Sequence, residues 1–175
     1  MKTLIKNGLV VDPANLVQTH LNLLLEDGKI VAVTEEEPEA DRVIDAAGKV
    51  VAPGFIDIHM HEDPVKDDKI QFCIFDAMLR MGVTTAVGGN CGINVYDPVK
   101  YLDLLERDGA PVNVMMFAGH QYYREAAGAL DKYSPVTEEQ RKMMKKGLEE
   151  ALEAGCVGIS YGLRYVPGTG REDLR

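Results

Sequence analysis

Short runs of branched and apolar side chains alternate with polar turn pairs over residues 1–52, a pattern that predicts β-strands joined by hairpins. Three pairs supply the positive φ that tight hairpin turns require, namely Asn7-Gly8, Asp27-Gly28 and Ala47-Gly48. We expect residues 4–5 to pair with residues 10–11, and residues 21–25 to pair with residues 30–33. Residues 1–52 are therefore predicted to form a small antiparallel β module.

After Pro53-Gly54 the pattern changes to apolar runs that alternate with segments of helical periodicity, which is typical of βα units and a parallel sheet. Thr137 and Gln140 form a capping-box pattern that opens a long helix, and Gly155 closes it. The predicted strands cover residues 55–61, 83–87, 113–117 and 157–160, and the other predicted helices cover residues 70–81 and 99–107. We therefore place a domain boundary between residues 52 and 53.

Four βα steps amount to half of a (β/α)8 barrel of the TIM type, a fold that needs roughly 250 residues. The chain has 175 residues, and residues 171–175 have the pattern of a helix that is just beginning. We therefore predict that residues 53–175 form the first half of such an α/β barrel, in a truncated chain. The alternative is a compact four-stranded α/β domain, which would leave the edges of its sheet unprotected.

Charge and composition narrow the range of partners. The chain has 28 acidic and 19 basic residues, a net charge of -9, and its Lys and Arg residues do not cluster, so we expect no nucleic-acid partner. No stretch approaches the ~20 apolar residues of a membrane span or forms a signal-peptide core, so we expect a cytoplasmic protein with no membrane segment. The three cysteines are odd in number and widely spaced, which argues against a disulfide framework. Cys73 and Cys156 lie within apolar patterns and are expected to be buried.

The strand predicted at residues 55–61 carries the most informative chemistry. Alternation places Asp57, His59 and His61 on one face of the strand and apolar side chains, including Ile56 and Ile58, on the other. In a parallel barrel the last residues of such a strand lie at the C-terminal rim, where active sites form. Two histidines spaced in this way have backbones about 6 to 7 Å apart, a gap that zinc can bridge with bonds of ~2.0 Å to each nitrogen. The alternative is that both side chains only make hydrogen bonds.

A glycine-rich loop after the second strand adds a third candidate ligand. Gly88-Gly89-Asn90-Cys91-Gly92 presents one thiol at the same predicted rim. Cys91 with His59 and His61 makes a soft N/N/S set, and a thiolate favours zinc over magnesium or calcium. A phosphate cradle is the alternative reading of the glycines, but the loop lacks the Lys-Ser/Thr end of a P-loop. We therefore predict a zinc site at His59, His61 and Cys91.

These motifs resemble those of the amidohydrolase superfamily, and most closely those of the D-aminoacylases, the N-acyl-D-amino-acid deacylases. In chain order they are the N-terminal hairpin module, residues 53–61 with Asp63, Gly89-Asn90-Cys91-Gly92, Gly119-His120, residues 158–160 and residues 162–168. The His-x-His element is widespread in the superfamily, whereas Asn-Cys-Gly is the more specific mark. Residues 62 and 63 read Glu-Asp where an Asp-Asp pair is common, and Tyr161 stands where a smaller residue is often found, so the pocket is expected to differ.

The resemblance implies a zinc-dependent barrel accompanied by a small β-sandwich domain, to which residues 1–52 would contribute strands. It implies one or two zinc ions, with His59 and His61 at one metal position and Cys91 holding zinc, either alone or as a bridge. Further histidines on the fifth and sixth strands and a general-base aspartate on the last strand would complete the site. Since the chain contains none of these, it is expected to have no catalytic residue of its own, to need the missing C-terminal half, and to be inactive alone.

The implied substrate is a small-molecule N-acyl amino acid or a related amide. His120 after the third strand, with Arg164 and Tyr165 after the fourth, are the candidate substrate-binding residues; Arg offers a planar fork of donors to a carboxylate. A surface-loop role for Arg164 and Tyr165 is the alternative. A hydrolase similar to dihydroorotase, hydantoinase or isoaspartyl dipeptidase is the second functional hypothesis. A non-catalytic metal-binding barrel relative is the third, and a homo-oligomer is compatible with any of them.

Overall fold

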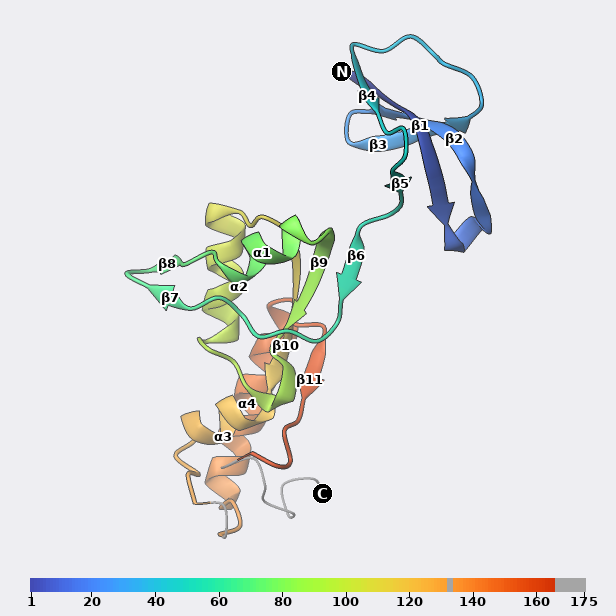
Figure 1. Ribbon diagram of the computed structural model, residues 1–175. Coiled ribbons are helices and arrows are strands. Elements are labelled where there is room, and N and C mark those ends of the chain that lie inside the picture. Colours follow the sequence, from blue (N-terminus) through green and yellow to red (C-terminus); the bar gives the residue numbers. More distant parts are fainter. Residues whose placement is uncertain (132–133, 166–175) are drawn as a thin grey trace. The chain divides into compact units, whose positions relative to one another are not determined.

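The computed structural model of the protein describes residues 1–131 and 134–165 (Figure 1). Its chain divides into two compact units, Met1–Pro53 and Gly54–Arg175. No helix among the described residues is long and apolar enough to cross a membrane. Each unit has its own sheet and its own buried side chains.

The first unit is one mixed sheet. Strands β1 (Lys2–Asp12), β2 (Val17–Glu26) and β3 (Lys29–Thr34) pair antiparallel in sequence, with the short 3-10 helix η1 (Pro13–Asn15) between the first two. Strands β4 (Arg42–Asp45) and β5 (Val50–Val51) both pair with β1 in the parallel sense. The buried apolar side chains of this unit are Leu4, Val10, Leu23, Leu24 and Ala46. Residues 1–52 therefore do form a small β module, but it is not wholly antiparallel.

The three turn pairs predicted for this unit have three different outcomes. Asp27-Gly28 is the hairpin turn between β2 and β3, with Leu25 opposite Ile30, as predicted. Asn7, however, has a φ of 64° inside β1, where the register shifts, and its backbone N–H donates to Asn22 Oδ1 at 3.1 Å. The predicted hairpin at Asn7 is thus wrong, because its positive φ serves a bulge and the strand continues. The third pair, Ala47-Gly48, lies between β4 and β5, which each pair with β1 in the parallel sense. The hairpin predicted there is therefore wrong, because the two strands pair with β1 and not with each other.

The second unit is built on a parallel sheet in the order β11-β10-β9-β6. The strands are β6 (Phe55–Asp57), β9 (Val83–Gly88), β10 (Asn113–Gly119) and β11 (Gly158–Ser160). The helices are α1 (Ile74–Arg80), α2 (Pro98–Asp108), α3 (His120–Ala126) and α4 (Glu138–Glu153). Neighbours in the sheet follow one another along the chain, as successive βα units do. The α/β class is thereby confirmed, and the described residues form an open sheet; barrel closure and the β-sandwich stay predictions.

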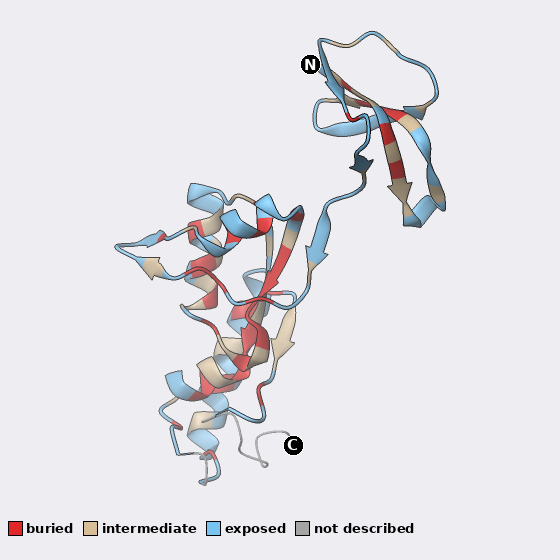
Figure 2. Cartoon of the chain, in the orientation of Figure 1, coloured by how far each residue is buried: buried red, intermediate tan, exposed pale blue. Residues whose placement is uncertain are grey.

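The core of this unit lies between the two central strands and the helices (Figure 2). α1 packs against β9, while α2, α3 and α4 pack against β10. Fully buried side chains in this layer include Phe75, Ala86, Tyr101, Met116 and Ala118. Such a close-packed layer fixes the carboxyl ends of β9 and β10 in relation to each other.

Two boundaries differ from the predicted ones. Strand β6 ends at Asp57, so His59 and His61 lie in irregular backbone just beyond it. The helix predicted at residues 70–81 begins only at Ile74, because β7 (Val65–Lys66) and β8 (Lys69–Ile70) form a hairpin before it. By contrast, the capping box predicted at Thr137 and Gln140 is present at the start of α4.

Exposure also departs from the predicted pattern at three positions. Ile56 and Ile58 are exposed, and the helices described make their main contacts with β9 and β10. Cys156 is buried as expected, but Cys73, which directly precedes α1, is exposed.

Candidate metal centre

His59 and His61 flank a buried anchor. Met60, between them, is 5% exposed and its backbone N–H donates to Val87 O at 3.3 Å, which ties the segment to the end of β9. The backbone N–H of His59 donates to Asp57 Oδ1 at 3.0 Å. Met60 is thus buried, while the histidines on either side of it are exposed. Both histidines are exposed and thus accessible to an ion.

Cys91 lies in the short 3-10 segment η2 (Asn90–Gly92) directly after β9. Its φ is 60°, and the glycines on either side of the Asn90-Cys91 pair, Gly89 and Gly92, also have positive φ. A side chain other than glycine costs roughly 1–2 kcal/mol in the left-handed region. Cys91 is therefore held in an unfavourable conformation that turns its thiol towards the histidines, and such strain is typical of functional sites.

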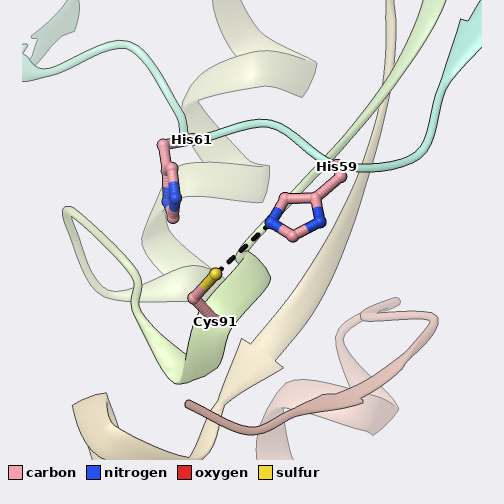
Figure 3. A group of neighbouring side chains, drawn as sticks. All are labelled: His59, His61 and Cys91. Carbon is pink, nitrogen blue, oxygen red and sulfur yellow. Dashed lines mark hydrogen bonds between the residues drawn. The ribbon is translucent and has the colours of Figure 1, made fainter. Parts of the chain in front are cut away.

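The three side chains converge (Figure 3). His59 Nε2 lies 3.3 Å from Cys91 Sγ, and one ligand atom from each of His59, His61 and Cys91 lies within 4.8 Å of the others. A tetrahedral zinc ion spaces its nitrogen and sulfur ligands roughly 3.3–3.6 Å apart. The separation of 3.3 Å between His59 Nε2 and Cys91 Sγ lies in that range. No other pair of ligand atoms is farther apart than 4.8 Å, which is about 1.5 Å beyond the lower limit of that range. The donor set and its spacing therefore fit zinc.

The two acidic residues after His61 have different environments. Glu62 is 2% exposed, and burial raises the pKa of its carboxyl; Oε1 accepts a hydrogen bond from Asn94 Nδ2 at 2.9 Å. Burial also acts to raise the pKa of Asp63, but hydrogen bonds from the Cys73 thiol and from backbone N–H groups outweigh it, so that pKa is lowered. Those bonds come from the first residues of α1, so Asp63 caps a helix. Neither carboxylate belongs to the group of ligand atoms at His59 and Cys91.

Several polar contacts around η2 were not foreseen in the sequence. Ser160 in β11 accepts a hydrogen bond from Gly92 N at 2.9 Å and donates one to Gly89 O. A Cβ added at Gly162 would overlap the carbonyl oxygen of Cys91, so the chain after β11 packs directly on the loop. The only sequence signal was the density of small and amide residues there. β11 and the residues directly after it thus hold the loop with Cys91 in place.

The predicted substrate residues do not all lie together. His120, at the start of α3, is 3% exposed and packs beside Tyr161 with ring centroids 5.1 Å apart. Both line a cavity of about 250 Å³ whose other lining residues are Val136, Arg141, Met144, Lys145, Leu148, Glu149, Leu152 and Ile159. Arg164 and Tyr165 are exposed beyond β11 and do not line that cavity. Their roles as substrate contacts stay predictions.

His59, His61 and Cys91 lie beyond the carboxyl ends of two adjacent parallel strands, β6 and β9. This arrangement is typical of α/β proteins whose metal sites form at the carboxyl edge of the sheet. Comparison with known proteins identifies the family within this class. Residues 42–164 match the model of the amidohydrolase family, and the chain belongs to that family.

Individual relatives agree with this assignment. The chain is 33% identical over 187 residues to the N-acyl-D-glutamate deacylase of Alcaligenes xylosoxydans xylosoxydans, covering 94% of the chain and 38% of that protein. The N-acyl-D-glutamate deacylase of Bordetella bronchiseptica, solved with zinc and a phosphonate inhibitor, superposes with a TM-score of 0.83 at 30% identity. A D-aminoacylase structure superposes with a TM-score of 0.85 at 28% identity. Each alignment with these structures covers 98% of the chain and 41% of the solved protein.

The comparisons also show how much of its relatives the chain covers and which metals those relatives contain. The chain spans about two fifths of the length of the relatives it matches. Zinc is present in the deacylase structure, and a binuclear metal centre is described for D-aminoacylase. The soft ligand set at His59, His61 and Cys91 is suited to the same kind of cofactor.

Proposed function

We propose that the chain supplies the first half of the catalytic barrel of a zinc-dependent amidohydrolase that cleaves the amide bond of an N-acyl-D-amino acid. In this proposal residues 1–52 belong to the β-sandwich portion and residues 53–175 to the barrel. One observation carries it: His59, His61 and Cys91 converge beyond the ends of adjacent parallel strands in a chain of the amidohydrolase family.

The residues of the chain have distinct roles in this mechanism. His59 and His61 present imidazole nitrogens and Cys91 a thiolate to zinc, with the thiol held in place by its loop. Zinc bound there supplies Lewis-acid polarisation of the substrate carbonyl and activation of water near neutral pH. Protonation of the leaving amine is assigned to an aspartate of a later strand. His120, Arg164 and Tyr165 are assigned to the substrate, with the Arg164 guanidinium matched to a carboxylate.

A chimera tests the proposal. Residues 1–175 replace the corresponding part of the Alcaligenes deacylase, and the product is loaded with zinc and assayed with N-acetyl-D-glutamate, N-acetyl-D-methionine and their L enantiomers. We expect turnover of at least one D substrate and none of the L substrates, and loss of turnover in the His59→Ala chimera. A folded, zinc-loaded chimera that hydrolyses dihydroorotate or a hydantoin, but no N-acyl-D-amino acid, would overturn the substrate class.

The chain by itself is expected to be inactive, because the proposed site needs the later ligands and the general base. The purified 175-residue chain, loaded with zinc, is assayed with the same substrates. Chelator-sensitive turnover would show that the later strands are dispensable and would refute this part of the proposal.

A further inference from the structure

The side-chain amide of Asn90 links the two halves of the candidate metal centre. Asn90 is 8% exposed and immediately precedes Cys91. Its Nδ2 lies 2.7 Å from Val87 O, 3.3 Å from Met60 O and 3.4 Å from Ile58 O. Two of these carbonyls belong to the residues on either side of His59. One amide therefore bonds both to its own loop and to the backbone that holds the histidines.

The contacts of Asn90 with Ile58 and Met60 are important because the pairing of β6 with β9 has already ended before these residues. Strand β6 stops at Asp57, and its last residue paired with β9 is Asp57 opposite Ala86. Beyond it, the segment with both histidines is joined to β9 and η2 through the backbone N–H of Met60 and through the Asn90 amide. An amide has two N–H donors, so three acceptors at these distances share them and Asn90 is fully used as a donor.

We propose that Asn90 is a positioning residue of the metal centre: its amide sets the spacing between Cys91 and the His59–His61 segment. The proposal rests on the metal site of the proposed function, but it assigns a task to a residue that does not touch the ion. Loss of an outer contact that keeps a ligand in place typically weakens metal affinity 10–100-fold.

Asn94 provides a matched control. It lies four residues further along the same loop, is also 8% exposed and also makes three hydrogen bonds. Its partners are Glu62 Oε1, Phe117 O and the backbone N–H of Gly119, so it ties the loop to β10 and to a buried carboxyl. It bonds to no backbone atom of residues 58–61. Removing its side chain should disturb the loop and its bond to the Glu62 side chain, but it leaves the backbone contacts at Ile58 and Met60 in place.

The experiment compares three variants of the chain, Asn90→Ala, Asn90→Ser and Asn94→Ala, with the unsubstituted protein. Zinc affinity is measured by competition with a chromophoric chelator, and cobalt(II) reports whether a thiolate is bound through its sulfur-to-metal charge-transfer band. We expect both Asn90 variants to bind zinc about 10–100-fold more weakly and to lose part of that band, whereas Asn94→Ala changes affinity less than about threefold. Asn90→Ser is the milder substitution, because its hydroxyl can still donate one bond within the loop.

Every outcome bears on the proposal. Equal zinc affinity in a folded Asn90 variant, or equal losses in Asn90→Ala and Asn94→Ala, would refute the positioning role and leave the metal site intact. Failure of the unsubstituted chain to bind zinc would overturn the metal site and with it this role. If Asn90→Ala does not fold, Asn90→Ser decides, and a lower midpoint of thermal unfolding with an unchanged cobalt spectrum would show a merely structural residue.

Discussion

The three thiols of the protein have different surroundings and should differ in reactivity. Cys91 is half-buried beside His59, whereas Cys73 is exposed and donates to Asp63 Oδ1 at 2.9 Å, a hydrogen bond that raises the pKa of its thiol. Burial, with Glu62 and Asp97 nearby, raises the pKa of Cys156 to about 11. Since the thiolate is the reactive form, a raised pKa makes a thiol less reactive at a given pH.

Alkylation at pH 8, read out by peptide mass spectrometry, should distinguish these thiols. At that pH a thiol with a pKa of about 11 is roughly one part in a thousand thiolate, so buried Cys156 should react slowest. Saturating zinc should slow the alkylation of Cys91 and leave the rate at Cys73 unchanged. Equal protection of both cysteines, or of neither, would contradict the assignment of Cys91 as the ligand.

The positive φ of Cys91 has a stability consequence that is separate from metal binding. Cys91→Gly and Cys91→Ala both remove the thiol, but only glycine adopts a φ of 60° without strain. Relief of roughly 1–2 kcal/mol of strain outweighs the ~0.4–1 kcal/mol that glycine loses through the freedom of the unfolded chain. Urea denaturation without metal should therefore find Cys91→Gly more stable than Cys91→Ala by about 1 kcal/mol. The reverse order would show that the loop relaxes to another conformation.

At the level of elements, α1 depends on a residue eleven positions before its first residue. The residue that precedes the helix, Cys73, provides no side-chain cap. Asp63 takes that role: it is fully buried and accepts hydrogen bonds from the backbone N–H of Ile74 at 2.7 Å and of Phe75 at 3.0 Å. The carboxylate also follows His61 by two residues, so it links the first turn of α1 to the candidate site.

Removal of this cap should destabilise the protein measurably. Asp63→Ala leaves buried N–H groups without an acceptor and should lower the free energy of unfolding by about 1–3 kcal/mol in urea denaturation at neutral pH. Asp63→Asn keeps one acceptor oxygen and should lose less. If both variants matched the unsubstituted protein, water or other donors would have replaced the contact, and Asp63 would not be a structural cap.

The elements also show which features the sequence could predict. Asp27-Gly28 and the capping box at Thr137 are local signals that need only neighbouring residues, and both hold in the structure. The Asn7-Gly8 pair has the same local preference for positive φ, but whether it turns the chain or bulges the strand depends on β2 and β4, far away in sequence. Local pattern therefore identifies elements better than it identifies their partners.

In the candidate site too, the residue types could be predicted from the sequence better than the contacts between distant residues. His59, His61 and Cys91 could be predicted to meet because parallel strands bring their carboxyl ends to one edge. The contacts of Asn90 with Ile58 and of Asn94 with Glu62 join residues 32 positions apart and leave no periodic signal. The candidate ligands can thus be predicted from the sequence, whereas the residues whose side chains contact the segments that carry them cannot.

For the whole molecule, the central question is whether this chain binds zinc through the site described. His59, His61 and Cys91 would supply three protein ligands, the number typical of catalytic zinc sites. The net charge of -9 also favours a cation over an anionic partner at long range.

X-ray absorption at the zinc edge of the purified, zinc-loaded chain tests this claim most directly. The structure predicts one sulfur scatterer at about 2.3 Å, contributed by Cys91, together with imidazole nitrogens at about 2.0–2.1 Å. Cys91→Ser should remove the sulfur contribution. A zinc shell of nitrogen and oxygen alone in the unsubstituted chain, or no zinc retained after dialysis, would contradict the proposed metal centre.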